Sequence, residues 1–260
     1  HKTVRAKKLM SQEEFDLLLD KITGKAKYLY FHLMGEPTLH PLLPHFIKVA
    51  RDRGFLPMVT TNGSLLRGKG EALLACLPYK ISISLHAPEA NAAFADEGYL
   101  EHCVSFAKAA ASRGCIVALR LWNLGSGADN SHVLDFLHAV FPGEWGKVRG
   151  GSSLRLSERL FLEWGEHFEW PDLSLPACDP DADMFCYGLR DQIGILVDGT
   201  VVPCCLDADA KLALGNLFTS ELGDILDSPR AKALYDGFSH RRAVEPLCRT
   251  CGYAKRFSRS

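Results

Sequence analysis

The sequence lacks both a long apolar run and an excess of one charge. Of its 260 residues, 30 are Lys or Arg and 31 are Asp or Glu, which gives a net charge of −1. A chain with this balance has no overall attraction for nucleic acid or another polyanion. No stretch reaches the roughly 18 apolar residues that a transmembrane helix needs. We therefore expect neither a nucleic-acid partner nor a membrane partner.

The sequence also lacks a visible signal peptide and the even cysteine count of a disulfide scaffold. It contains nine cysteines, and Cys204 and Cys205 are adjacent. An odd count with a vicinal pair favours a reducing compartment, in which thiols stay available for metal ions. We expect the protein to be cytoplasmic.

Apolar strands alternate with amphipathic helices along the first 170 residues. Strands are predicted at residues 28–34, 56–61, 80–85 and 115–122 and within 154–162. Helices are predicted at residues 11–24, 41–53, 67–76, 99–113 and 130–140. This alternation is typical of an α/β fold with a parallel sheet and right-handed crossovers, and a barrel or partial barrel is the leading architecture. The apolar run at 28–34 predicts a strand buried on both faces.

The alternation stops near Pro171, and the prolines and aspartates that follow predict a linker at residues 171–185. Two β-type runs at 192–197 and 200–203 are joined by Asp198-Gly199, which predicts a hairpin. A helix is predicted at 219–236. We therefore expect a first domain at residues 1–170 and a small cysteine-rich domain of hairpin and helix at residues 186–260.

The small domain holds five of the nine cysteines. Cys248 and Cys251 form a C-x2-C pair, and the hairpin brings Cys204 or Cys205 toward Cys186. A hairpin that supplies one or two thiolates and a tight turn that supplies two more can surround a zinc ion or an iron–sulfur cluster. The other cysteines have blander interpretations: Cys76, Cys103 and Cys115 are predicted to be small buried residues.

Polar residues follow the ends of successive predicted strands. They are Gly35-Glu36-Pro37, Asn62, Ser84, Arg120 and Asn123. Ligands of parallel sheets collect at these ends. Glu36 could accept a hydrogen bond from an ammonium group, and Arg120 could donate two to a carboxylate. The series therefore predicts a site for a small zwitterion.

These motifs together resemble radical S-adenosylmethionine (AdoMet) enzymes over nearly the whole chain. Gly35-Glu36-Pro37 resembles their GEP motif, and Thr61-Asn62-Gly63 and Ser82–His86 resemble the ends of their next two strands. Cys186, twelve residues, Gly199, four residues and Cys204 resemble the start of their SPASM or twitch extension. Gly215-Asn216 and the closing Pro246–Gly252 segment match the same extension.

The resemblance implies a partial (βα)6-type TIM barrel that lacks its first strand. It implies that AdoMet binds at Gly35, Glu36, Pro37, Asn62, Ser84, Arg120 and Asn123. It also implies an auxiliary [4Fe-4S] cluster on Cys186, Cys204, Cys248 and Cys251, with Cys204 preferred to Cys205. The implied activity is an oxidoreductase acting through a 5'-deoxyadenosyl radical on a peptide, a protein side chain or a small molecule. A flavodoxin or ferredoxin would donate electrons.

One feature of that family is absent: no C-x3-C-x2-C spacing, which binds the catalytic [4Fe-4S] cluster, occurs in these 260 residues. Because residue 1 is His, we expect that loop to lie just upstream, and we expect the 260 residues alone to be inactive. Two alternatives remain. One is an α/β protein with a structural zinc ion held by four cysteines, and the other is a non-catalytic relative that binds a partner. The sequence identifies no catalytic side chain.

Overall fold

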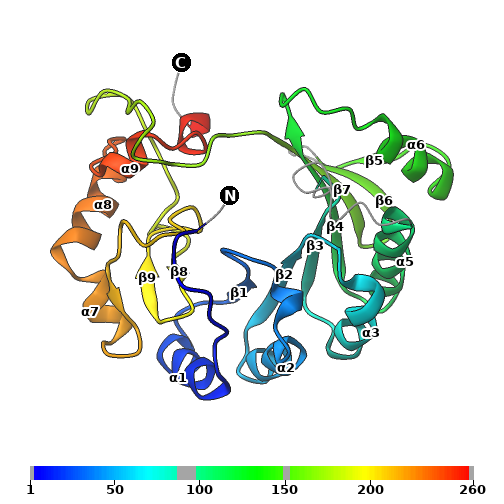
Figure 1. Cartoon of the computed structure of the whole chain (residues 1–260), viewed down its shortest axis with the longest axis horizontal. Coiled ribbons are helices and arrows are strands. Elements are labelled where there is room, and N and C mark those ends of the chain that lie inside the picture. Colours follow the sequence, from blue (N-terminus) through cyan, green and yellow to red (C-terminus); the bar gives the residue numbers. More distant parts are fainter. Residues whose placement is uncertain (1–2, 87–97, 149–152, 258–260) are drawn as a thin grey trace. The chain divides into compact units, whose positions relative to one another are not determined.

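The computed structural model describes residues 3–86, 98–148 and 153–257. The chain divides into two compact units (Figure 1). One consists of Gly24–His167 and is called the sheet unit; the other combines His1–Thr23 with Phe168–Ser260 and is called the cysteine unit. This division differs from the predicted one because the first helix groups with the C-terminal residues. His1, on which the upstream expectation rests, lies outside the described residues.

A seven-stranded sheet forms the centre of the sheet unit, in the order β1-β2-β3-β4-β7-β6-β5. Five strands are parallel: β1 (Tyr28–Phe31), β2 (Leu56–Thr61), β3 (Lys80–Ser84), β4 (Ile116–Leu124) and β7 (Leu160–Glu166). Two more are antiparallel at one edge: β6 (Ser153–Ser157) and β5 (Gly146–Lys147). The connections contain η1 (Pro37–Leu39), α2 (Leu43–Asp52), α3 (Leu66–Cys76), α5 (Tyr99–Ser112) and α6 (Ser131–Val140). The predicted α/β fold with a parallel sheet is confirmed.

The two faces of this sheet differ sharply. One face is apolar and packs into a core with the helices, which lie on one side of the sheet in Figure 1. Its strand residues include Val59, Ile81, Ile83, Val117, Leu119, Leu121, Leu160 and Leu162, which are all buried. The strand register places alternate residues on the other face, where Ser84, Arg120 and Glu163 are neighbours. A parallel sheet is normally apolar on both faces, so the polar face indicates a place for a ligand.

The prediction that residues 28–34 form a strand buried on both faces is wrong. The strand β1 ends at Phe31, and the side chains of Tyr28 and Tyr30 are 43% and 52% exposed. The strand register places both tyrosines on the polar face, and β1 is an edge strand of the sheet. The apolar composition of the run therefore did not reveal its one-sided burial.

Two further predicted elements are each divided in the structure. The single strand expected within 154–162 is a hairpin of β6 and β7, turning at Arg159, which has a φ of +58°. The helix expected at 219–236 is split into α7 (Leu222–Leu226) and α8 (Pro229–Ser239). Proline has no N–H for a continuing helix, and the Ser228 side chain instead caps the new one.

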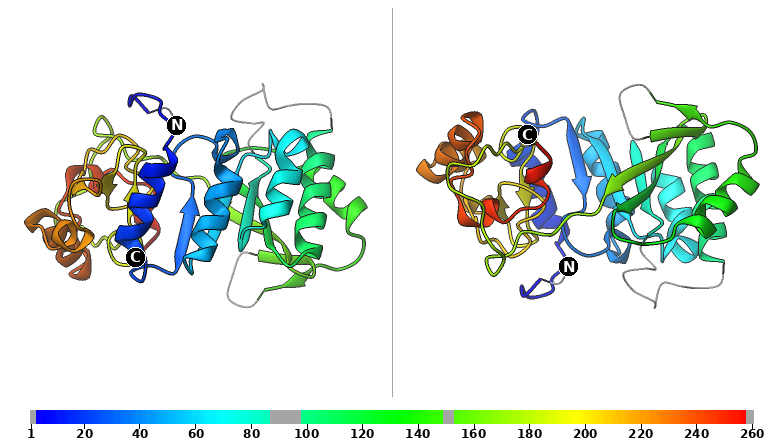
Figure 2. Two further views of the ribbon diagram at one scale, coloured as in Figure 1. Left: turned by 90° about the horizontal axis from the view of Figure 1, so that it is seen from below. Right: turned by 90° about the horizontal axis from the view of Figure 1, so that it is seen from above.

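The cysteine unit has little regular structure. Its strands β8 (Gly194–Ile195), β9 (Thr200–Val202) and β10 (Gly215–Asn216) form an antiparallel sheet in which β8 and β9 make the predicted hairpin. Its helices are α1 (Gln12–Ile22), α7, α8, α9 (Pro246–Arg249) and η3 (Ala254–Phe257). In Figure 2, α1 (dark blue) lies beside the C-terminal segments, where Lys21 donates a hydrogen bond to the carbonyl of Ser220 (2.9 Å). Of the helices that the structure describes, none is both long and apolar enough for a membrane span.

Candidate functional site

The loop after β1 has a strained backbone. Leu33 has a φ of +124°, which side chains with a Cβ rarely adopt, and Gly35 follows with a φ of +87°. The loop leads into Glu36, which caps the 3-10 helix η1. Strain of this kind costs about 1–3 kcal/mol and collects at ligand-binding segments. The structure thus singles out the predicted Gly35-Glu36-Pro37 turn.

The carboxylate of Glu36 is the centre of a hydrogen-bond network. Its Oε1 accepts from the N–H and the hydroxyl of Thr38 (3.0 and 2.6 Å) and from the hydroxyl of Thr61 (2.8 Å). Its Oε2 accepts from the N–H of Asn62 (2.7 Å). The two donors from Thr61 and Asn62 therefore tie the loop after β1 to the end of β2, and the two from Thr38 fix the carboxylate locally. Two predicted ligand residues, Glu36 and Asn62, are brought together.

Tyr99, at the start of α5, joins the ends of β2 and β3. Its hydroxyl lies 2.6 Å from the carbonyl oxygen of Asn62 and 3.1 Å from that of Ser84, and donates to this pair. Burial is the main cause of the raised pKa of Tyr99, which keeps the hydroxyl protonated as a donor. Gly63 lies beside it with a φ of +78°, and a Cβ there would be 2.5 Å from the sulfur of Cys103. Close packing therefore fixes these two strand ends.

Arg120 lies on the polar face among charged and aromatic neighbours. Its Nε donates to Oε2 of Glu163 (3.1 Å), and the Nζ of Lys80 donates to Oε1 of the same carboxylate (2.7 Å). The guanidinium carbon of Arg120 is 4.4 Å from the ring centroid of Trp122. Burial raises the pKa of Glu163, but the hydrogen bonds and charges of Lys80 and Arg120 outweigh it, so the pKa is lowered. Glu163 is an anion that holds two cations.

Asn123 is used differently from the other predicted ligands. It is 5% exposed, and its amide exchanges two hydrogen bonds with the amide of Asn130 (2.9 and 3.0 Å). This pair ties the end of β4 to the residue before α6. The structure therefore groups Glu36, Asn62, Ser84 and Arg120 along neighbouring strands, a set that we call the strand-end site, while Asn123 bonds to the loop before α6.

Sequence reasoning missed several members of this region. Thr38, Thr61 and Tyr99 act through contacts between segments far apart in the chain, and no local motif marks them. Lys80 and Glu163 did leave a signal, because a charged residue inside an apolar strand needs a partner when it is partly buried. Opposite charges in two such strands could have suggested the pair.

The six C-terminal cysteines gather in one part of the cysteine unit. Cys251 belongs to a buried cluster with Met184, Leu206, Leu234 and Phe238. The partly buried cysteines packed against it are Cys178, Cys186, Cys204, Cys205 and Cys248. None of the nine cysteines forms a disulfide. Cys76, Cys103 and Cys115 are buried in the sheet unit, as predicted.

The pKa shifts show that the predicted ligands lie close together. Burial raises the pKa of Cys248 well above its usual value, and negative charge on Cys204, Cys186 and Cys251 raises it further. The pKa of Cys205 is also raised, first by burial and then by Cys186 and Cys251. Cys204 is therefore coupled to every other member of the predicted set, which we call the cysteine site: Cys186, Cys204, Cys248 and Cys251. Thiols held together in this way become stable thiolates when they bind a cation.

Glycines shape the backbone around the cysteine site. The N–H of Gly188 points at the sulfur of Cys186 (3.4 Å). Gly199, in the hairpin turn, has a φ of +81°, and a Cβ there would be 2.7 Å from Oδ1 of Asn216. A Cβ on Gly252 would be 2.8 Å from the backbone of Glu169. The spacing of glycines and cysteines thus reflects backbone packing. Among residues 3–86, 98–148 and 153–257, no three His, Cys, Asp or Glu side chains are arranged to hold a single metal ion.

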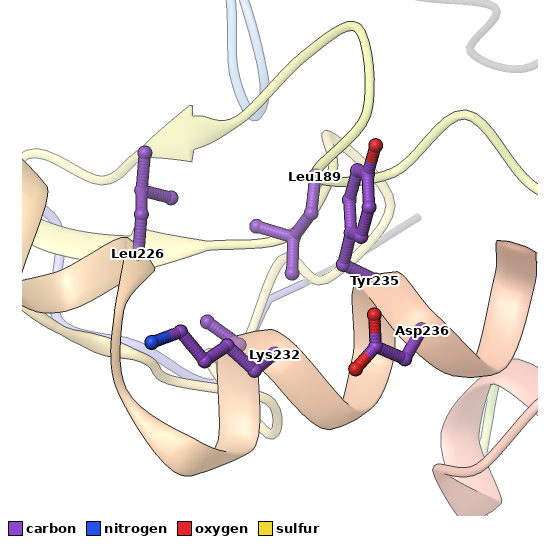
Figure 3. A pocket seen from close by; sticks show the side chains of 6 residues that line it. Leu189, Leu226, Lys232, Tyr235 and Asp236 are labelled. Carbon is purple, nitrogen blue, oxygen red and sulfur yellow. The ribbon is translucent and has the colours of Figure 1, made fainter.

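A pocket lies on the surface of α8 in the cysteine unit. Figure 3 shows Leu189, Leu226 and Tyr235 with the charged Lys232 and Asp236 around it. Tyr235 is 42% exposed, and the guanidinium of Arg190 stacks 4.8 Å from its ring centroid. The pocket contains none of the predicted ligand residues.

The cysteine unit matches a known family. Residues 186–252 match the family described as SPASM, an iron–sulfur cluster-binding domain. The matched segment contains all four residues of the cysteine site and both glycines of the motif, Gly199 and Gly215. The predicted resemblance of this region is confirmed.

Solved structures resemble almost the whole chain. BtrN in complex with AdoMet and 2-DOIA is 17% identical, with 95% of this chain and 82% of that chain covered and a TM-score of 0.57. The protein anSMEcpe with bound AdoMet and Kp18Cys peptide is 14% identical, with 99% and 84% covered and a TM-score of 0.59. SuiB of Streptococcus suis, bound to AdoMet, is 14% identical, with 89% and 62% covered and a TM-score of 0.57.

A search of curated proteins gave no match. The solved structures therefore show the fold, and the family match shows the kind of C-terminal domain. The chain has a mixed α/β fold similar to that of the AdoMet-bound BtrN and anSMEcpe structures, and its residues 186–252 match the SPASM domain.

Proposed function

We propose that the protein is a radical AdoMet oxidoreductase that modifies a peptide or protein side chain. The observation that carries this proposal is a parallel sheet with one polar face whose strand ends hold Glu36, Asn62, Ser84 and Arg120, in a chain with a SPASM domain. We propose that the sheet unit is a partial (βα)6-type TIM barrel lacking its first strand, and that AdoMet binds at its strand ends.

The chemistry of the strand-end site fits AdoMet, which carries an ammonium, a carboxylate and a ribose. Oε2 of Glu36 accepts one hydrogen bond from the protein, so this oxygen can accept another from an ammonium. Gly35 and Pro37 shape the loop beside it. Arg120 is the cation available for the carboxylate, and Ser84 and Asn62 provide polar groups for the ribose. We assign Asn123 the supporting role of fixing the end of β4 through Asn130.

The cysteine site fits an auxiliary [4Fe-4S] cluster. Cys186, Cys204, Cys248 and Cys251 supply the thiolates that such a cluster needs. The Gly188 N–H at the sulfur of Cys186 would stabilise its thiolate form. A catalytic cluster held by upstream cysteines would supply the one electron that cleaves AdoMet into methionine and a 5'-deoxyadenosyl radical. In this proposal the residues of the sheet unit orient AdoMet and substrate and exclude water.

A peptide substrate is supported by the similarity to anSMEcpe, whose structure contains a Kp18Cys peptide. A small molecule is the other possible substrate, since BtrN holds 2-DOIA. A flavodoxin or ferredoxin is the proposed electron donor. Because no C-x3-C-x2-C loop is present, the 260 residues alone should bind an auxiliary cluster without cleaving AdoMet.

Anaerobic reconstitution tests the proposal. Iron and sulfide should each reach about four atoms per chain, with broad visible absorption, and AdoMet should bind the reconstituted protein. Stoichiometric zinc without sulfide would favour the structural zinc alternative instead. A full cluster with no affinity for AdoMet would favour a non-catalytic relative.

A further inference from the structure

The guanidinium of Arg120 is held on one edge and one face. Its Nε edge is occupied by Glu163 (3.1 Å), and its face lies against the ring of Trp122 (4.4 Å). Within residues 3–86, 98–148 and 153–257, these are the contacts that orient it. The two terminal nitrogens form the remaining edge, which has the geometry for two parallel hydrogen bonds to a carboxylate.

Glu163 is itself held from behind. Lys80 donates to its Oε1 (2.7 Å) while Arg120 uses its Oε2. The side chains of Lys80, Arg120 and Glu163 are 20%, 19% and 20% exposed, so water screens these charges only in part. The three side chains carry a net charge of +1, which leaves the group able to attract one more anionic charge.

Close packing also fixes the position of the Trp122 ring, which lies against the face of the Arg120 guanidinium. A Cβ on Gly165 would lie 2.7–2.9 Å from three atoms of the Trp122 ring, so only glycine allows the ring to lie at this position on β7. The indole Nε1 of Trp122 is buried and has no hydrogen-bond partner among the described residues. A buried donor without a partner costs about 1–3 kcal/mol, which is typical of a site that a ligand completes.

We infer that Glu163 and Lys80 are positioning residues, which aim Arg120 at the carboxylate of AdoMet. Lys80 fixes the carboxylate of Glu163, Glu163 fixes the Nε edge of Arg120, and Trp122 over Gly165 fixes its plane. This inference rests on the proposed function and extends it to residues that no strand-end motif contains. A general-base role for Glu163 is disfavoured, because both of its oxygens accept hydrogen bonds from cations.

Two nucleoside ligands separate positioning from general structural support. S-adenosylhomocysteine carries the amino-acid carboxylate, and methylthioadenosine lacks it. In the reconstituted full chain, Glu163→Gln should weaken binding of S-adenosylhomocysteine by roughly tenfold, as expected for a misaligned charged hydrogen bond. Binding of methylthioadenosine should change less than about twofold. Isothermal titration calorimetry measures both, and Glu158→Gln, an exposed acid in the β6–β7 turn, is the matched control.

A double-mutant cycle tests whether Glu163 acts through Arg120. Arg120→Gln alone should lose most of the preference for the carboxylate-bearing ligand, and adding Glu163→Gln should then have no further effect. Additive losses would overturn the inference, as would equal weakening of both ligands. Lys80→Met, with a smaller selective loss expected, provides the same test if Glu163→Gln fails to fold. If the wild-type chain binds neither ligand, the proposed function fails; if it binds both but Glu163→Gln binds normally, the positioning role alone fails.

Discussion

The strand-end site and the cysteine site differ in how the protein holds their side chains. Around Glu36, four donors already occupy the carboxylate, and Tyr99 joins the neighbouring strand ends. Around Cys248, by contrast, burial and neighbouring thiols raise the pKa, and no disulfide joins the sulfurs. Protein donors already hold Glu36 at the first site, whereas the thiols of the second need a cation to be stable as thiolates.

The difference indicates how each unit depends on its ligand. Hydrogen bonds join the strand ends of the sheet unit without a ligand, so this unit should fold without AdoMet, whose binding would then stabilise it by mass action alone. The cysteine unit has short strands and buried thiols, so a cluster should contribute directly to its folding. The experiments that follow change one side of this comparison at a time.

Loss of a cluster ligand should have the largest effect. Cys248→Ala should reduce the iron bound by the reconstituted 260-residue chain well below about four atoms, because one iron of the cluster loses its thiolate ligand. Iron and sulfide analysis measures this change. Cys205→Ala is the matched control and should keep its iron, since Cys205 lies outside the proposed ligand set. Full iron in Cys248→Ala would show that the ligand set is wrong.

Removal of the Glu36 carboxylate should be the next largest change. Glu36→Ala leaves the donors of Thr38, Thr61 and Asn62 without their acceptor, and should cost about 3 kcal/mol of unfolding free energy. Urea unfolding, followed by a signal from the sheet unit, measures it. Glu71→Ala, an exposed acid on α3, should be nearly neutral.

Glu36→Gln tests the negative charge of Glu36 separately from its hydrogen bonds to the protein. It keeps the shape of the side chain but removes the charge, so it should weaken AdoMet binding. An unchanged AdoMet affinity would contradict the ammonium-binding role of Glu36 while leaving its part in joining β1 and β2 intact.

A smaller loss is expected when the connection between β2 and β3 is removed. Tyr99→Phe deletes the hydroxyl that donates to the carbonyls of Asn62 and Ser84, and should cost about 1 kcal/mol. The same urea transition reports it. Tyr235→Phe, on the exposed surface of α8, is the control. A cluster content that fell in Tyr99→Phe would contradict the separation between the two sites.

The smallest expected effect is a pH dependence of stability. The folded pKa of Glu163 is lower than the usual value of 4.5, so its contribution is present above that pH and is lost as pH falls through the folded pKa. Wild-type and Glu163→Gln stabilities should therefore differ by about 1 kcal/mol or less at pH 7 and converge as the pH falls below 4.5. A difference that grew on acidification would contradict this interpretation.

The sequence predicted the features that are encoded locally. The alternation of apolar strands with amphipathic helices located the parallel strands. Asp198-Gly199 located a hairpin turn in which Gly199 has a φ of +81°, a conformation that suits glycine. The break before Pro229 could also have been predicted, since Ser228-Pro229 is a standard helix start. The antiparallel hairpin of β6 and β7 was less accessible, because its turn at Arg159 has no glycine.

The sequence alone could not predict the contacts between distant segments that build the candidate sites. The pattern identified Glu36 and Asn62 separately, but their hydrogen bond depends on the register of β1 and β2. Similarly, Arg120 was predicted to donate to a carboxylate of the ligand, and only the structure shows that its Nε donates to Glu163. Motifs thus located the candidate ligand residues, and the tertiary structure revealed the residues that hold them.

The division of the chain has a consequence for its synthesis. The sheet unit is one continuous stretch, whereas the cysteine unit joins His1–Thr23 to Phe168–Ser260. During synthesis, α1 precedes its partners by more than 170 residues: Asp198 and Asp209 bind Arg5 and Thr3, and Ser220 binds Lys21. The apolar side of α1 (Phe15, Leu18, Leu19 and Ile22) must therefore remain uncovered while Gly24–His167 folds. A cluster on the proposed ligands needs cysteines on both sides of β9, so its insertion would have to wait until Cys251 has been translated.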